Sequence, residues 1–401
     1  MLYYLINYIN KIYDIPGIGV FEYISFRASL ALMISLLISL FLGGYIIKIL
    51  KKYQVDDQIR ELGLKGENKK KGTPTMGGFI IIISILIPTI LICKINNIYI
   101  LLMVITTIWL GLIGFIDDYI KVFKKNKKGL AAKFKIIGQV ILGCVVGSIL
   151  HFHSDVLVKT SKSIDNLGNG LNTYVKSSIT TIPFFKNNEL NYSDLISFLI
   201  NEPEKWSWII FIPIVIFIIS AVSNASNLTD GMDGLAPGIS AIIGLVLALY
   251  AYVSSNLVFS DYLNIMFIPY SEELVIFMSS FVGSCIGFLW YNSYPAQIFM
   301  GDTGSLSIGG IIAVFSIAIR KELLIPIFCG VFFIESISVI IQVLYFKYSR
   351  KKFGKGKRIF LMSPLHHHFQ LKGIHESKIV TRFWILAVIL AILSFLILKL
   401  R

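Results

Sequence analysis

Residues 98–118 read IYILLMVITTIWLGLIGFIDD, a nearly continuous apolar run that ends in two adjacent aspartates. An α-helix needs about 20 apolar residues to cross a bilayer, and this run has that length. Similar runs recur along the chain, and their length and apolarity exclude a β-barrel. We predict ten transmembrane helices, at 25–48, 77–94, 98–116, 134–152, 207–223, 235–254, 274–290, 304–320, 323–346 and 382–399.

The composition of the whole chain agrees with a membrane protein. Of 401 residues, 55% are hydrophobic and 15% are charged, and the mean hydropathy is +0.75. Soluble globular chains carry about 25% charged residues. The net charge of +14 would suggest nucleic acid in a soluble protein, but no nucleic-acid-binding module is recognisable here. We therefore predict an all-α polytopic integral membrane protein that binds no nucleic acid.

The basic residues indicate how the chain is oriented. Three loops are rich in Lys and Arg, at 51–76, 117–133 and 347–381. With ten spans these loops fall on one side of the membrane, which the positive-inside rule identifies as the cytoplasm. Both termini are then expected outside. The loops 224–234 and 291–303 share the cytoplasmic face but contain no Lys or Arg, which suggests that they have another task.

The remaining segments fit one transmembrane domain over residues 1–401. Within residues 1–22, apolar residues at helical spacing predict an amphipathic helix in the membrane interface. Residues 153–206 are predicted to form an external loop, with local structure around 192–200 and no evident chemistry. Arg320 and Lys321 leave room only for a tight turn. The cysteines sit in apolar runs without a CxxC pair and are read as small apolar residues, at Cys93, Cys144, Cys285 and Cys329.

The first chemical signal is the pair Asp117 and Asp118. Two adjacent carboxylates at a membrane edge repel each other, so a nearby cation must compensate them. The simpler alternative is two solvated loop acids neutralised by Lys121 and its neighbours.

The second signal is SNASNLTDGMDG at 223–234, where Asp230 and Asp233 would share a face on a helical turn and Asn227 adds hydrogen-bonding groups. A polar loop between apolar spans is costly unless it lines a site. The third is WYNSYPAQIFMGDTGS at 290–305. Its Gly-Asp-x-Gly-Ser start of a helix could hold a phosphate or a metal-bound phosphate. A capped turn and a plain Asp N-cap are the respective alternatives.

The fourth signal is SPLHHHF at 363–369. Three consecutive histidines point about 100° apart on a helix and lack a fourth ligand, so contact with phosphate or sugar is favoured over zinc. The fifth is KKKGTPTMGG at 69–78, which is basic and then glycine-rich but lacks the Walker order. Solvated histidines and a basic membrane flank are the alternatives. All five signals fall on the predicted cytoplasmic face. Carboxylates without a cage suit Mg²⁺, and the set predicts phosphoryl transfer.

These motifs, in this order over residues 23–399, resemble the polyprenyl-phosphate hexose-1-phosphate transferases. The triple histidine followed by Phe369, with Pro364 two residues ahead, favours the muramoyl-pentapeptide branch. The resemblance implies that undecaprenyl phosphate attacks the β-phosphate of UDP-MurNAc-pentapeptide, with Mg²⁺, giving UMP and lipid I for peptidoglycan synthesis. It places the enzyme in the bacterial cytoplasmic (inner) membrane, with the site on the cytoplasmic face.

The resemblance also implies residue roles. Asp117 would activate or orient the lipid phosphate, and Asp118 and Asp302 would sit at Mg²⁺, with Asp302 the more direct ligand. Asn227, Asp230 and Asp233 would line the nucleoside end, with Phe299 under the uracil ring. The residues implied to contact the pyrophosphate, the sugar or the lipid phosphate are Lys70, Thr75, Lys125, Lys133, Asn292, His366, His367 and His368.

Within the span 323–346, Glu335 and Gln342 are polar residues at membrane depth, which indicates a role. The resemblance adds a bent ninth helix beside a lipid groove, which Glu335 would support. Direct attack is favoured over a covalent aspartyl intermediate, because a phosphate monoester is already anionic.

Two other functions compete with this interpretation. One is a transferase of GlcNAc-1-phosphate, and the other is an ion-coupled transporter. A transporter would carry acids near the midplane and repeat symmetry, whereas here the acids gather at one face and no repeat is found. The sequence leaves open the third residue of the stem peptide, the task of 153–206, and the oligomeric state, a homodimer included.

Overall fold

The computed structural model describes residues 1–13, 17–53, 70, 72–126, 128–164, 170–183, 189–198, 201–263 and 265–399. Parts of the predicted 1–22 and 153–206 segments therefore lie outside the described residues. So do several lysines and one arginine of the predicted basic loops, at Arg60, Lys65, Lys69, Lys71 and Lys127.

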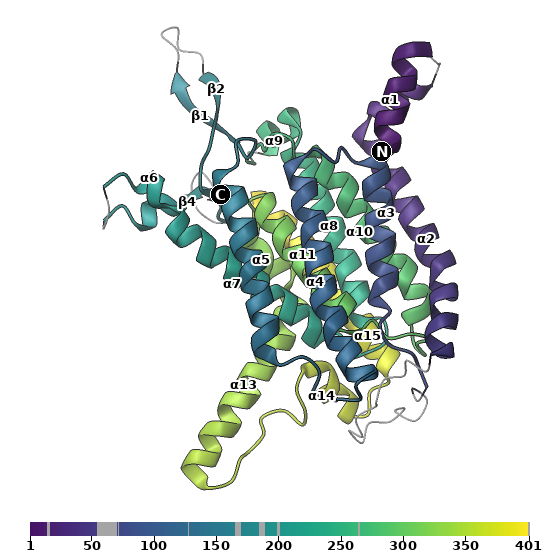
Figure 1. Cartoon of the computed structure of the whole chain (residues 1–401). Coiled ribbons are helices and arrows are strands. Elements are labelled where there is room, and N and C mark those ends of the chain that lie inside the picture. The colour runs from purple at the N-terminus through teal and green to yellow at the C-terminus, as the bar shows by residue number, and fades with distance from the viewer. Residues whose placement is uncertain are drawn as a thin grey trace.

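The described chain is a bundle of long helices (Figure 1). Nine of its helices are long and apolar enough to cross a membrane. A further apolar helix, α3 (Gly78–Ile92), has only 15 residues. The prediction of an all-α polytopic membrane protein is confirmed, and nine of the ten predicted spans correspond to one helix each, the exception being 323–346. The nine long apolar helices are α2 (Ile24–Lys52), α4 (Ile98–Val122), α5 (Ala132–Phe152), α7 (Trp208–Thr229), α8 (Leu235–Ser254), α10 (Glu272–Asn292), α11 (Gly301–Ala318), α13 (Gly330–Phe353) and α15 (Glu376–Lys399).

Helix α11 forms the centre of the bundle. Every residue of it from Thr303 to Ala318 is buried. It packs against α4 and α7, while α10 packs against α2, α3 and α8, and α5 lies along α7. Three of the four cysteines are buried as predicted, but Cys144 is exposed on the outside of α5. Figure 1 shows the last turns of α13 projecting away from the other helices.

Glycines bring α3 and α4 against the start of α11. A Cβ added at Gly78 would lie 2.1 Å from the backbone N of Gly304, and one at Gly114 would lie 2.3 Å from the carbonyl oxygen of Asp302. Because a membrane interior gives little hydrophobic drive between helices, such close backbone approach supplies much of the packing energy. These two contacts set the position of the start of α11, and so of Asp302, relative to α3 and α4.

Gly114→Ala is therefore expected to destabilise the protein by about 1–3 kcal/mol or more, because the added methyl group forces α4 and α11 apart. The measurement is the melting temperature in detergent. The matched control is Gly19→Ala, where an added Cβ meets nothing within 4 Å. Equal melting temperatures for the two variants would contradict the close approach.

Several predicted boundaries differ from the structure. Helix α4 continues to Val122, so Asp117 and Asp118 are helical rather than part of a loop. Helix α7 likewise continues to Thr229 and leaves only a short turn at 230–234. In both cases polar side chains near the helix end find partners inside the protein, so the helix does not end where apolarity ends.

The predicted span 323–346 is broken into three pieces. These are η4 (Glu322–Leu324), α12 (Ile325–Phe328) and α13. Pro326 lies in the first turn of α12, where its missing N–H group costs no hydrogen bond, so a new helix starts there. The long helix that follows begins only at Gly330.

Both chain ends lie at the end of the bundle opposite α14 (Leu365–Leu371) in Figure 1. Helix α1 (Leu2–Tyr13) has no buried residue, and the ammonium group of Met1 donates to the carbonyl oxygens of Ile90 and Leu91 at 2.6 and 3.2 Å. The 3₁₀ turn η1 (Ile18–Glu22) precedes α2. Which end of the bundle faces the cytoplasm, and an interfacial place for α1, stay predictions.

The segment 153–206 contains more structure than the local element expected near 192–200. Two antiparallel pairs form there, β1 (Val158–Ile164) with β2 (Gly170–Val175) and β3 (Ile179–Thr181) with β4 (Glu189–Asn191). The turn η3 (Tyr192–Leu195) and α6 (Pro203–Trp206) follow, and the short α9 (Leu257–Leu263) comes later in the chain.

Side-chain hydrogen bonds connect β3 and η3 to the predicted tight turn after α11. Lys321 Nζ donates to Thr181 Oγ1 at 2.7 Å, and the Tyr192 hydroxyl donates to Glu322 Oε1 at 2.9 Å. The charged residues of this turn are therefore buried under the segment 153–206 rather than solvated.

Candidate active site

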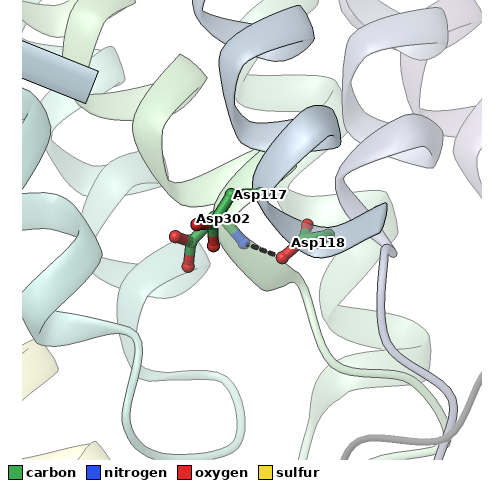
Figure 2. Close-up of side chains that lie close together, drawn as sticks. All are labelled: Asp117, Asp118 and Asp302. Atoms are coloured by element: carbon green, nitrogen blue, oxygen red, sulfur yellow. Dashed lines mark hydrogen bonds between the residues drawn. The ribbon is translucent and has the colours of Figure 1, made fainter. Parts of the chain in front are cut away.

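Three carboxylates from two helices meet at one end of the bundle. Asp117 and Asp118 lie near the end of α4 and Asp302 in the first turn of α11, and their ligand atoms all lie within 4.8 Å of one another. Figure 2 shows the carboxylates of Asp117 and Asp302 side by side, with Asp118 directed at the backbone of Asp302. The fold thus brings together acids that the sequence analysis named separately.

Asp118 caps the start of α11 from the neighbouring helix. Its Oδ1 accepts from the backbone N of Asp302 at 3.0 Å, and its Oδ2 accepts from the backbone N and the hydroxyl of Thr303 at 2.9 and 2.6 Å. The side chain is 3% exposed. The first N–H groups of α11 therefore donate to a protein carboxylate. The negative charge of Asp118 is also stabilised by the positive end of the α11 dipole.

Two lysines neutralise the other two acids. Lys121 Nζ lies 2.5 Å from Asp117 Oδ2 and 3.3 Å from Asp302 Oδ1. Lys135 Nζ lies 2.5 Å from Asp302 Oδ2 and 3.0 Å from Asp117 Oδ1. The expectation of a compensating cation holds, but the acids form an internal cluster rather than a pair of solvated loop residues. Three carboxylates face two ammonium groups, which leaves one negative charge.

Lys135 is a site residue that the sequence analysis missed. It shares its face of α5 with buried Gln139 and Leu142, whereas the predicted Lys133 is exposed and rests 5.1 Å from the ring centroid of Phe134. The spacing of buried residues along α5 is the signal that distinguishes the two lysines. Within the described chain, neither Lys133 nor the predicted Lys125 contacts the acidic cluster; Lys125 is exposed with a φ of 50°.

Asn227 joins the second motif to the acids. Its Nδ2 donates to Asp302 Oδ1 at 2.9 Å and to Ser305 Oγ at 2.8 Å. Asp230 lies in the turn that follows α7, with φ −77° and ψ 57°, so the helical i, i+3 relation expected with Asp233 does not apply.

Lys70 and Asp233 form a second charged group, completed by Glu376. Lys70 Nζ lies 2.7 Å from Asp233 Oδ1 and 2.6 Å from Glu376 Oε1, and Glu376 Oε1 also accepts from the backbone N of Asp233 at 2.9 Å. Burial opposes the charge on Lys70, but the two carboxylates raise its pKa above the usual value. Glu376, at the start of α15, was missed because nothing in its own sequence context marks it.

The other predicted contacts of the third and fifth motifs lie beside these groups. Asn292 is buried, accepting from the backbone N of Gly234 at 2.9 Å and donating to the carbonyl of Ile298 at 2.8 Å. Phe299 places its ring centroid 6.0 Å from Lys70 Nζ. Thr75 is buried against Gly301, where an added Cβ would lie 3.1 Å from its Oγ1.

The three histidines have different surroundings. His366 is fully buried beside Glu335. His367 Nδ1 lies 3.3 Å from Gln370 Oε1, and His368 Nδ1 accepts from the backbone N of Leu361 at 3.1 Å. The rings of His366 and His367 are neighbours, with centroids 4.3 Å apart and planes at 60°, whereas the His368 ring packs on Phe360 at 5.8 Å.

Comparisons with known proteins now give the family. The description Glycosyl transferase family 4 matches residues 100–320. Proteins named phospho-N-acetylmuramoyl-pentapeptide-transferase from Flavobacterium psychrophilum, Flavobacterium johnsoniae and Amoebophilus asiaticus are 58%, 59% and 60% identical, over the full length of both chains. The chain belongs to the phospho-N-acetylmuramoyl-pentapeptide transferases. The family predicted from the ordered motifs is confirmed, and the chain is a multi-pass membrane enzyme of the transferase class.

In this member of the phospho-N-acetylmuramoyl-pentapeptide transferases, the donor set fits a divalent cation. Carboxylate oxygens are the ligands that Mg²⁺ prefers, and it is usually held by one or two of them plus water and substrate phosphates. Asp302 and Asp117 would offer oxygens now shared with the lysines. Asp118 would offer only the remaining lone pairs of oxygens that already accept three hydrogen bonds.

Acid is expected to destabilise this transferase through His367. Burial, and then the neighbouring His366, lowers the pKa of His367 to about 4. The unfolded chain therefore binds more protons between about pH 4 and 6.5, so stability falls as pH drops through that window and stays level above it. The melting temperature should fall between pH 7 and pH 5, and this fall should be smaller in His367→Gln than in the wild type. The exposed His375→Gln is the control; equal losses in all three proteins would contradict the prediction.

Proposed function

We propose that this chain transfers phospho-MurNAc-pentapeptide from UDP-MurNAc-pentapeptide to undecaprenyl phosphate, giving UMP and lipid I for peptidoglycan synthesis. The reaction would take place at the cytoplasmic face of the bacterial inner membrane and use Mg²⁺. The names of the full-length relatives support the transferase activity. The three-acid, two-lysine cluster at the end of α4 and α11 is the structural observation that carries the proposal.

The chemistry needs charge compensation more than covalent help. An oxygen of undecaprenyl phosphate forms a bond to the β-phosphorus of the donor, while the bond from that phosphorus to the bridging oxygen breaks and UMP leaves with the electron pair. The attacking group is already anionic, so catalysis depends on bringing two anions together and on stabilising the transition state electrostatically.

The lysines of the cluster suit that task. Lys121 and Lys135 each bridge Asp117 and Asp302, so each has an ammonium group held at the point where the acids converge. We assign them to the phosphate oxygens, with Asp117 orienting the lipid phosphate. Bound Mg²⁺ would supply Lewis-acid stabilisation of the pyrophosphate, with Asp302 as its main protein ligand.

The second group would hold the nucleoside end. Lys70, Asp233 and Phe299 lie together beside the turn 230–234, and Asn227 connects that turn to Asp302. A cation, a carboxylate and an aromatic ring are a suitable set for a pyrimidine nucleotide. We place the uracil and ribose there and the pyrophosphate between this group and the acidic cluster.

The test is UMP release by purified protein in detergent with undecaprenyl phosphate, Mg²⁺ and one UDP-sugar at a time. We expect release with UDP-MurNAc-pentapeptide and none with UDP-GlcNAc. Release with UDP-GlcNAc alone would assign the chain to GlcNAc-1-phosphate transfer. If purified protein that is shown by its melting transition to be folded releases no UMP with either UDP-sugar, the proposed function is contradicted.

A further inference from the structure

A buried carboxylate and a buried imidazole face each other beneath the nucleotide-binding turn. Glu335 on α13 and His366 on α14 are both 0% exposed. Glu335 Oε2 lies 3.2 Å from His366 Nδ1 and accepts from the backbone N of His366 at 3.4 Å. A carboxylate in an apolar helix is costly to bury without a partner. Within the described residues, the Glu335 carboxylate contacts His366 through both its ring and its backbone N–H.

The pair is not fully satisfied within the described chain. Glu335 Oε1 has no hydrogen-bond partner, and neither ring nitrogen of His366 has one with good geometry, although Nδ1 is within reach of Oε2. Buried polar atoms without partners are rare in folded proteins and call for an explanation. A purely structural pair would be expected to close its hydrogen bonds.

The other side of the imidazole touches the second motif. A Cβ added at Gly231 would lie 2.3 Å from His366 Nε2 and 3.0 Å from its Cε1. Gly231 stands between Asp230 and Asp233, and Asp233 binds Lys70. The ring of His366 therefore fills the space beside Gly231 in the turn that carries these residues.

We propose that Glu335 is a positioning residue that acts through His366 on the turn 230–234, and that His366 supports this turn from beneath instead of contacting substrate. A carboxylate beside Nδ1 selects the tautomer with hydrogen on Nδ1 and fixes the ring plane. The Nε2 side of the ring then lies against Gly231, where the absence of a side chain leaves room for it. This inference rests on the proposed function, since it takes the turn as part of the nucleotide site.

A positioning role for Glu335 and His366 predicts a change in the KM for the nucleotide substrate. Glu335→Gln and His366→Ala should each raise the KM for UDP-MurNAc-pentapeptide about tenfold or more, the change that corresponds to about 1.4 kcal/mol of lost positioning. The KM for undecaprenyl phosphate should change less than about twofold. A role in general stability alone would lower active protein and leave both KM values unchanged. His153→Ala is the control and should keep both KM values, because His153 follows the end of α5 opposite to Lys135 and accepts from the backbone N of Asp155.

Double variants test whether the two residues act as one unit. If Glu335 acts only through His366, then Glu335→Gln adds nothing in the His366→Ala background. Gly231→Ala pushes on the same ring from the opposite side, so its defect should also disappear when His366→Ala removes the ring. This second pair keeps the test open if Glu335→Gln fails to fold.

The experiment measures both KM values and the binding of UDP for the wild type, the singles and the doubles. Non-additive effects confined to the nucleotide side support the proposal. The proposal is overturned if the fold-changes in KM of the single variants multiply in both double variants, or if the KM values for the two substrates rise equally. UDP binding is measured separately from turnover. A wild-type protein that binds UDP but releases no UMP from either UDP-sugar would contradict the proposed function. The coupling between Glu335 and His366 could then still be judged from UDP binding by the variants.

Discussion

Asp302→Asn is expected to reduce the rate of UMP release at least about 100-fold while the protein stays folded. Asp302 is the one acid that binds both lysines and Asn227, so it connects the phosphate end of the site to the nucleotide end. An amide keeps the shape but loses the charge that holds the two ammonium groups. Losing one electrostatic contact to a transition state costs about this much. The measurement is the turnover number, with the melting temperature taken alongside.

Asp155→Asn is the control for this variant, because Asp155 is exposed just beyond the end of α5, in the predicted external segment. It should change neither rate nor melting temperature. Asp118→Asn is expected to lower both, since it caps α11. A near-normal rate for both Asp302→Asn and Asp118→Asn would move the reaction centre elsewhere.

The helical fold and the acids could be predicted because their signals are local. A 20-residue apolar run is a property of one segment, and an aspartate at its end, such as Asp117, stands out against it. The ends of α4 and α7 were misplaced for the same reason. Hydropathy falls where polar residues begin, but Asn227 and Asp118 stay helical because partners on α11 satisfy them.

The partners of the site residues could not be predicted, because they come from elements far apart in the chain. Glu376 lies 306 residues from Lys70, and Glu335 lies 31 residues from His366 across a helix end and a loop. Lys135 and Lys133 look alike in the sequence, and only the face of α5 that packs on α7 separates them. The histidine motif was recognised, but that its first member is buried under Gly231 depends on tertiary packing.

Chelation of Mg²⁺ is expected to abolish turnover and leave the fold intact. The pyrophosphate of the donor and the phosphate of the acceptor bring several negative charges beside three carboxylates, and two lysines cannot compensate all of them. Folding should not need the ion, because Lys121 and Lys135 already pair with the acids. UMP release should therefore vanish in excess EDTA and return with added Mg²⁺, at an almost constant melting temperature. Asp302→Asn should need more Mg²⁺ for its residual rate than the wild type, whereas Asp155→Asn should not. Full activity in EDTA would refute the metal assignment, and a collapse of the melting temperature in EDTA would show that the lysines do not hold the acids as described.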